Sequence, residues 1–292
     1  MSEEIKTPQN NLEVQALDNN AVLNVFKEEF SSTLNTVYVN SLHRDVRFRE
    51  VSVVEQKSLS KSMLSNERRR DIVYDLQCSL INRLCLEEGF DIYRLTEFDR
   101  IRILMEIYQS NYFKNTITYK CKECGAENTY TLDFGKIIDR LNAFDLSDKT
   151  YHLEDKNRHY NFVLNYPLVR NVSNFYKSYN KKYKNVTKDE REVIDNLGNI
   201  EYINLFIKQI EMISKADPGK RQVADLTMMS YNQIEQLISL FPQNIIFSDE
   251  NGVIKHITTE FIEKINGVFA YEKCLQCGAE TTEGIGGLGD FF

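Results

Sequence analysis

The spacing of apolar and polar positions predicts a chain that mixes short strands with amphipathic helices. Apolar residues alternate with polar ones over 33–40 and again over 45–53, and a turn-like segment separates the two runs, so we expect a β-hairpin there. Ser52 is followed by Glu55 three positions later, which is the pattern of a capping box. We therefore expect a helix over 53–64, directly after the hairpin.

Two longer helices are predicted by a period of about 3.6 residues. Apolar residues form one stripe along 71–85, and Thr96 with Asp99 marks the start of a second apolar helix. Cys78 and Cys85 lie on or beside the stripe of the first helix and do not have CxxC spacing. We interpret both as small buried side chains, because an isolated free cysteine behaves as a small hydrophobic residue.

The rest of the chain changes repeatedly between the two periods. Short segments that contain Gly, Pro or Asn separate the runs, as expected for turns, and a Pro-Gly turn at 217–220 follows one strongly apolar run. Hairpins are expected at 115–134, 151–166 and 244–257, helices at 136–144, 171–180, 199–213, 234–241 and 259–265, and a final strand at 268–274.

The strongest chemical signal is a motif that occurs twice. The sequence Cys-x-x-Cys-Gly-Ala-Glu appears once in the middle of the chain and once near its end, and the two copies supply four of the six cysteines. A CxxC turn presents two thiolates on one side of a tight loop, and the glycine after it lets the backbone turn without a Cβ clash. Two such turns complete a tetrahedron of sulfur ligands. One structural zinc ion per chain is therefore predicted on Cys121, Cys124, Cys274 and Cys277.

Two other arrangements remain open for these motifs. One is a redox-active CxxC, although no thioredoxin-like βαβ pattern surrounds either copy. The other is a pairing of each CxxC turn with a turn from another subunit, which the spacing does not distinguish from a site within one chain. A metal site of four cysteines leaves no ligand position for water, so either metal-bound arrangement is structural rather than catalytic.

These features predict the α+β fold class, with helices and short antiparallel β-hairpins and a zinc ribbon closed by two distant CxxC turns. The closure makes the chain between the two turns a large excursion that returns to the ribbon. We expect a flexible N-terminal arm at 1–30, a hairpin with helices at 31–115, a ribbon (116–134 with 268–283) that encloses an α+β excursion within 116–292, and a C-terminal tail at 284–292.

Composition limits the classes of protein to which the chain can belong. The 292 residues carry a net charge of −7, and 42% of them are hydrophobic, which is enough for a buried core. The negative charge argues against a generic nucleic-acid binder, and short basic runs at 68–70 and 181–188 are interpreted as solvated surface. The N-terminus lacks the apolar core of a signal peptide, and no apolar run approaches the roughly 20 residues that span a bilayer. We therefore expect folding in a reducing cytoplasm, where paired CxxC turns favour metal over disulfides.

No arrangement of residues in the sequence predicts catalysis. His43, His152, His159 and His256 are scattered, and none lies in an HExxH pattern or beside a nucleophile motif. Adjacent carboxylates elsewhere in the chain are interpreted as solvated surface. We expect a protein that is not an enzyme, and an enzyme with an unrecognised site is the alternative.

The order of the motifs resembles that of a set of phage tail proteins. The chain is similar to the baseplate hub subunits of T-even-type contractile-tailed phages (myoviruses), in the hub-assembly or central spike complex family. The similarity extends over 34–292 and is best from 46 to 180. The segments that carry it are VRFREVSVVEQKSLSKSML (46–64), LINRLCLEEGFDIYRLTEFDRIRILMEIY (80–108), ITYKCKECGAENTYTLDF (117–134) and VLNYPLVRNVSNFYKSY (163–179).

The resemblance implies a structural or assembly role in the tail baseplate of the virion, with assembly in the host cytoplasm. The partners that it implies are other baseplate hub, spike and tape-measure proteins, and baseplate wedge proteins are further candidates. It implies no catalytic residue on this sequence, and neither a membrane nor a nucleic acid is expected as a partner. The alternative function is that of a zinc-ribbon nucleic-acid-binding or transcription-related protein, for which a basic ribbon face would be the distinguishing feature.

Overall fold

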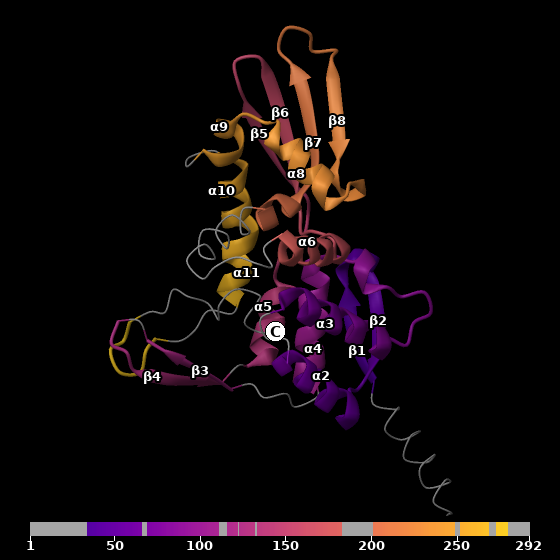
Figure 1. Ribbon diagram of the computed structural model, residues 1–292, viewed down its shortest axis with the longest axis vertical. Coiled ribbons are helices and arrows are strands. Elements are labelled where there is room, and N and C mark those ends of the chain that lie inside the picture. Colours follow the sequence, from indigo (N-terminus) through magenta and orange to yellow (C-terminus); the bar gives the residue numbers. More distant parts are fainter. Residues whose placement is uncertain are drawn as a thin grey trace, which may run out of the picture.

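The computed structural model consists of two bodies of helices and strands that share one hydrophobic core (Figure 1). We call them the lower body and the upper body, after their places in Figure 1. The arm expected at 1–30, the tail expected at 284–292 and the middle of the strand expected at 268–274 lie outside the residues that the structure describes. The described residues are 34–65, 69–110, 116–121, 123–131, 133–182, 201–248, 252–268 and 273–279.

The N-terminal hairpin expected from the alternation is confirmed. Strands β1 (Leu34–Val39) and β2 (Arg44–Arg49) pair antiparallel, and a turn of 3-10 helix (Asn40–Leu42) connects them. Alternate side chains of the two strands are buried, so one face of the hairpin lies against the core of the lower body. The inward side chains are Val37, Val39, Val46 and Phe48.

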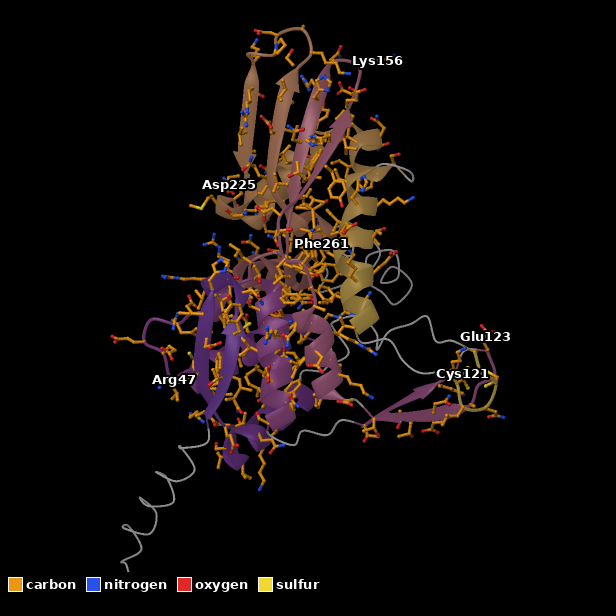
Figure 2. The ribbon with its side chains drawn as sticks, turned by 180° about the vertical axis from the view of Figure 1, so that it is seen from behind. Arg47, Cys121, Glu123, Lys156, Asp225 and Phe261 are labelled. Atoms are coloured by element: carbon orange, nitrogen blue, oxygen red, sulfur yellow. The ribbon has the colours of Figure 1, made fainter. Side chains whose placement is uncertain are left out.

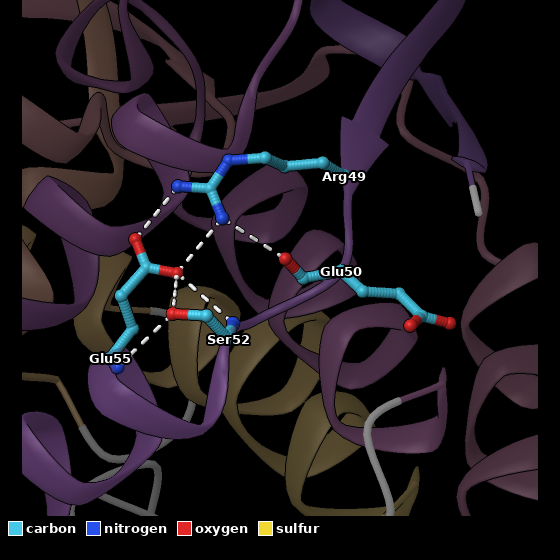
Figure 3. A network of polar contacts seen from close by, with 4 residues as sticks. All are labelled: Arg49, Glu50, Ser52 and Glu55. Carbon is cyan, nitrogen blue, oxygen red and sulfur yellow. Dashed lines mark hydrogen bonds and ion pairs between the residues drawn. The ribbon is translucent and has the colours of Figure 1, made fainter. Parts of the chain in front are cut away.

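Helix α2 (Val53–Ser65) begins at the predicted capping box, which Figure 3 shows from close by. The Ser52 hydroxyl accepts a hydrogen bond from Glu55 N at 3.3 Å, and the Glu55 carboxylate accepts one from Ser52 N at 3.0 Å. Arg49, at the end of β2, donates to both oxygens of this carboxylate, at 2.7 and 2.8 Å. The hydrogen bonds from Arg49 are the main reason that the pKa of Glu55 is lowered to about 2, and together the three side chains fix the corner between β2 and α2.

The two long amphipathic helices are also confirmed, as α3 (Arg70–Leu84) and α4 (Glu97–Ser110). An ion pair is buried between them. Arg100 donates to both carboxylate oxygens of Glu97 at 2.5 and 2.9 Å, and its guanidinium carbon lies 4.3 Å from the centre of the Tyr74 ring. Both charged residues belong to α4, and Arg100 contacts α3 through Tyr74. Removing one partner of a buried pair leaves an uncompensated charge, which typically costs about 3–5 kcal/mol.

The upper body is built on a four-stranded antiparallel sheet with the strand order β5-β6-β7-β8. The pair β5-β6 is the hairpin expected at 151–166. Helix α6 (Val169–Lys182), which confirms the helix expected at 171–180, follows β6 and packs between the two bodies (Figure 1). The strands are β5 (Lys149–Glu154), β6 (Arg158–Leu164), β7 (Ile207–Ser214) and β8 (Arg221–Asp225).

Helices from the last part of the chain pack against this sheet and continue down to the lower body (Figure 1). Phe241 lies 5.6 and 5.8 Å, between ring centres, from Tyr160 and Phe162 of β6. At the lower end, Arg140 donates to Val268 O at 3.0 Å. The helices are α8 (Tyr231–Ser239), α9 (Gln243–Phe247), α10 (Val253–Ile257), a π-helical turn (Thr258–Ile262) and α11 (Glu263–Val268), and Arg140 belongs to α5 (Phe134–Asn142).

The helix expected at 199–213 is wrong in its second half, since only residues 201–206 of it are helical in the described structure. Residues 207–214 form strand β7, which pairs with β6 on one side and with β8 on the other. The pairing with β6 skips one residue of β7 between Ile207 and Gln209, which is a β-bulge. The bulge allows Ile207 and Ile210, three positions apart, to be buried together, and this spacing imitates a helix. The apolar pattern does not predict β8. Its one large apolar residue is a valine, so the strand has no alternation of large apolar and polar residues.

The hairpin expected at 244–257 is also wrong, because its apolar residues lie in the short helices α9 and α10. The expected hairpin turn contains Gly252, whose N–H donates to Ser248 O at 3.0 Å. A Cβ atom at this position would lie 2.5 Å from Ser248 N and 2.8 Å from Ile246 O. Glycine is needed here for the close approach of the backbone to the end of α9, and not for a β-turn.

Candidate metal centre

The first CxxC turn lies at the tip of a hairpin that projects from the lower body (Figure 1). Strands β3 (Thr116–Lys120) and β4 (Glu127–Thr131) pair antiparallel along their full length, as the period-two pattern predicts. Figure 2 shows Cys121 and Glu123 at this tip, well separated from Phe261 in the centre of the molecule. The second CxxC turn, within 273–279, lies against the same tip.

The two CxxC turns have the same backbone geometry. Gly125 N donates to Cys121 O at 2.8 Å, and Gly278 N donates to Cys274 O at 2.9 Å. Both glycines have a φ of 72°, in the left-handed region that is costly for residues with a Cβ atom. The glycine that follows each CxxC in the sequence is therefore required by the turn, and the duplicated motif encodes a duplicated structure.

The four sulfur atoms lie together, although they come from the middle and the end of the chain. The Sγ atoms of Cys121 and Cys277 are 3.8 Å apart, those of Cys124 and Cys274 are 3.7 Å apart, and all four lie within 4.8 Å of one another. These separations are too long for disulfides, whose S–S bond is ~2.05 Å. A tetrahedron with Zn–S bonds of ~2.3 Å has edges of ~3.8 Å, so the sulfurs fit a four-coordinate metal ion.

Among the described residues, the four cysteines form the one group of three or more His, Cys, Asp or Glu side chains that could hold a metal ion. Cys121 and Cys274 are buried, at 3% and 2% exposure, while Cys124 and Cys277 are exposed. Hydrogen bonds from the backbone of Cys277 and Gln276 lower the pKa of the Cys274 thiol to about 6, whereas the neighbouring sulfurs raise the pKa of Cys277 to about 12, so the cluster favours one thiolate when no cation is bound. These donors stabilise a thiolate, which is the form that binds a metal.

Asn128 on β4 connects the two turns, and the CxxC motifs do not reveal it. Its amide nitrogen donates to Ala126 O at 3.1 Å and toward Cys274 Sγ at 3.4 Å, and its amide oxygen accepts from Leu275 N at 3.1 Å. The residue is only 4% exposed. Asn128 therefore fixes the second turn on the hairpin. The one sequence signal for it is an amide residue in the strand directly after the first turn.

The remaining cysteines and the histidines lie elsewhere. Cys78 is fully buried on α3, where burial raises the pKa of its thiol to about 12, and Cys85 is half-buried. The interpretation as a small core residue is thus confirmed for Cys78 and holds only in part for Cys85. His152 contacts Asn161, His159 contacts Glu154, and His256 stacks on Tyr151.

None of the helices in the described ranges is both long enough and apolar enough to cross a membrane.

The four cysteines predicted from the two motifs lie together in one candidate metal site, at the tip of the projecting hairpin and away from the centre of the molecule. This geometry suits a structural cross-link, because four cysteines would fill the coordination of a zinc ion without an open position.

Comparisons with known proteins identify the family. The model of the family described as T4 bacteriophage base plate protein matches residues 31–292. Comparison with curated proteins and with solved structures gives no match. The family match includes both bodies and all four cysteines of the candidate site. The chain therefore belongs to the T4 bacteriophage base plate protein family.

Proposed function

We propose that this phage baseplate protein is a structural and assembly component of the baseplate hub, and that zinc bound by its four clustered cysteines holds the chain in its assembled shape. The observation that carries the proposal is the convergence of the two CxxC turns, whose sulfurs lie within 4.8 Å of one another. We call these turns, 121–125 and 274–278, the zinc clasp. As a family member, the chain acts in the virion tail in association with other baseplate proteins.

The choice of zinc follows from the chemistry of the ligands. Four thiolates favour zinc or iron–sulfur chemistry over magnesium or calcium, which prefer oxygen ligands. The sulfur separations of 3.7 and 3.8 Å match the edges of a zinc tetrahedron, ~3.8 Å for Zn–S bonds of ~2.3 Å. Cys121, Cys124, Cys274 and Cys277 are the proposed ligands, with one ion per chain. The bound ion would supply cross-linking of the chain and no reaction.

The clasp closes a long loop of chain. It links the turn after β3 to residues close to the C-terminal end, so that the sheet of the upper body and its helices lie between the two linked points. A chain segment whose two ends are linked has less conformational entropy to lose when it is ordered on assembly than a segment with a free end. We therefore assign 116–292 to one clasped unit that follows the hairpin-and-helix unit at 31–115, with 1–30 and 284–292 as arms for binding neighbours.

The hub assignment is tested by the assembly intermediate that contains the protein. A phage deficient in this chain is complemented with a tagged wild-type copy or with the Cys121→Ser variant, and infectious particles and tail intermediates are counted. We expect the tagged protein to purify with hub, spike and tape-measure proteins, and the variant to complement poorly. Infectious tails in the absence of the chain, or purification with wedge intermediates alone, would contradict the hub proposal.

The nucleic-acid alternative has no support from the described surface of the ribbon. The sequence of the predicted ribbon, 116–134 and 268–283, holds three lysines against six acidic residues, so it carries no excess of positive charge. Phosphate binding depends on such an excess and weakens steeply with salt. We expect no salt-dependent binding of DNA or RNA by the purified protein.

A further inference from the structure

Strand β8 forms one edge of the four-stranded sheet, and no strand pairs with its outer side in the part of the chain that the structure describes. The helical column of α9 to α11 lies at the opposite edge, where His256 stacks on Tyr151 of β5 (Figure 1). Within the described residues, the outer backbone N–H and C=O groups of β8 therefore have no partner strand.

The side chains of β8 leave this edge open. Val223, at the centre of the strand, is 54% exposed, and the Arg221 side chain is 62% exposed. Proteins commonly protect an edge strand with lysine, proline, a bulge, other charges or a short length; β8 has no lysine, proline or bulge, but it is five residues long and is charged at both ends. An apolar centre between two charged ends is instead suited to pairing.

Two copies of β8 that run antiparallel to each other have complementary side chains at opposite positions. In an antiparallel pair centred on Val223, Arg221 lies opposite the partner's Asp225, and Gln222 lies opposite the partner's Ala224. The opposite charges meet at both ends of the pair. A shift that centres the pair on residue 221 or on residue 225 would place like charges opposite each other, and only the register centred on Val223 pairs opposite charges at both ends.

We propose that β8 pairs antiparallel with β8 of a second copy of this chain, which joins two four-stranded sheets into one sheet of eight strands. The two-fold axis would pass at Val223, as expected for an isologous dimer. A second copy fits better than an unrelated strand, because the charge pattern of β8 is satisfied by its own reverse. This inference is independent of the zinc clasp and of the hub assignment.

The contacts of β8 within the chain are compatible with this pairing. Arg221 contacts the Glu211 carboxylate through Nε, on the strand next to β8. Asp225 accepts hydrogen bonds from Thr227 N and Oγ1, at 2.9 and 2.6 Å, through Oδ1 alone. The terminal nitrogens of the Arg221 guanidinium and Oδ2 of Asp225 can then reach the partner strand.

The test uses variants in which a charge at one end of β8 is reversed. Their molar mass in solution is measured by light scattering or sedimentation. We expect the wild type to be a dimer, and Arg221→Asp and Asp225→Arg each to be monomeric, because each variant places like charges at both ends of the pair. Mixing the two variants should restore the dimer, since every pair then becomes Asp opposite Arg. Circular dichroism of each variant controls for folding. A monomeric wild type, or a mixture that stays monomeric, would overturn the proposal.

Cross-linking gives a readout that does not depend on charge. Val223→Cys places two cysteines directly opposite each other, at the ~4.5–5.5 Å Cα separation of an antiparallel pair, which a disulfide can bridge. Gln222→Cys is the matched control, because Gln222 lies opposite the partner's Ala224 and not opposite itself. Under mild oxidation we expect a covalent dimer with the Val223 variant only. Equal cross-linking of both variants, or of neither, would contradict the proposed register.

Discussion

Asn128 contacts both halves of the zinc clasp, so its side chain provides a test of the site at the scale of one residue. It holds Leu275 N at 3.1 Å and directs an amide proton toward Cys274 Sγ at 3.4 Å. Outer residues that orient metal ligands typically change metal affinity about 10–100-fold when they are removed. We expect Asn128→Ala to weaken zinc binding by about tenfold or more in a competition titration with a chromogenic chelator.

Thr129→Ala is the matched control for this titration, since Thr129 is the exposed neighbour on the same strand. The control should bind zinc as the wild type does. Equal affinities for the Asn128 variant and the control would mean that Asn128 does not position the second turn.

Glu55 should make the stability of the protein depend on pH. Its pKa is lowered from 4.5 to about 2, mainly by hydrogen bonds from Arg49, so the folded state favours the ionised carboxylate. A lowered pKa gives stability that is present above the unfolded value of 4.5 and is lost as the pH falls toward about 2. Because Arg49 is 29% exposed, solvent screening reduces the contribution, and we expect about 1–2 kcal/mol.

The measurement compares urea unfolding of the wild type and of Glu55→Gln between pH 6 and pH 3. The difference in unfolding free energy should be largest above pH 5 and should shrink toward pH 3. Glu50→Gln serves as the control, because the Glu50 carboxylate points away from Arg49 in Figure 3. A difference that is constant with pH would contradict the assigned role of the Glu55 charge.

At the scale of elements, the connection between α9 and α10 depends on a glycine. A Cβ at position 252 would meet backbone atoms of the end of α9 at 2.5–2.8 Å, whereas a Cβ at Gly267 in α11 would meet nothing within 4 Å. We expect Gly252→Ala to destabilise the protein by about 2 kcal/mol or more, and Gly267→Ala to stabilise it by about 0.5–1 kcal/mol. Urea unfolding of both variants measures the contrast, and equal effects would contradict the close approach.

Local patterns predicted those elements whose signals lie within a few neighbouring residues. The capping box at Ser52 and the apolar stripe of α3 depend on short-range spacing, and both are present. The two errors have non-local causes. The bulge in β7 is set by its pairing with β6, and the helical state of α9 and α10 depends on the packing of their apolar residues in the core, so neither can be recognised from spacing alone.

The same distinction applies to the candidate site. The four candidate ligands follow from the duplicated motif, because CxxC and the glycine after it define a complete local turn. That the two turns meet at the tip of one hairpin depends on the path of the chain between them. Asn128 is part of the site only because of that meeting, so its role could not be predicted from the strand in which it lies.

At the scale of the whole molecule, the zinc clasp lies outside the hydrophobic core. Of the residues in β3, β4 and the second turn whose side chains the structure describes, none belongs to the buried apolar cluster that joins the two bodies. Removal of the metal should therefore free the clasp without unfolding the rest. After chelation, we expect faster hydrogen exchange at 116–131 and 273–279 and unchanged protection in α3, α4 and β6. Global loss of protection would show that the metal supports the core as well.

The central claim is that four cysteines hold one zinc ion within each chain, and metal content measures it most directly. Zinc is quantified per chain by mass spectrometry in the reduced, freshly purified protein and in Cys121→Ser, Cys274→Ser and Cys78→Ser. We predict one zinc ion per chain in the wild type and in Cys78→Ser, and equal, severe loss in the two clasp variants because they share one ion. A wild type without zinc, or a loss in only one of the two clasp variants, would contradict the account.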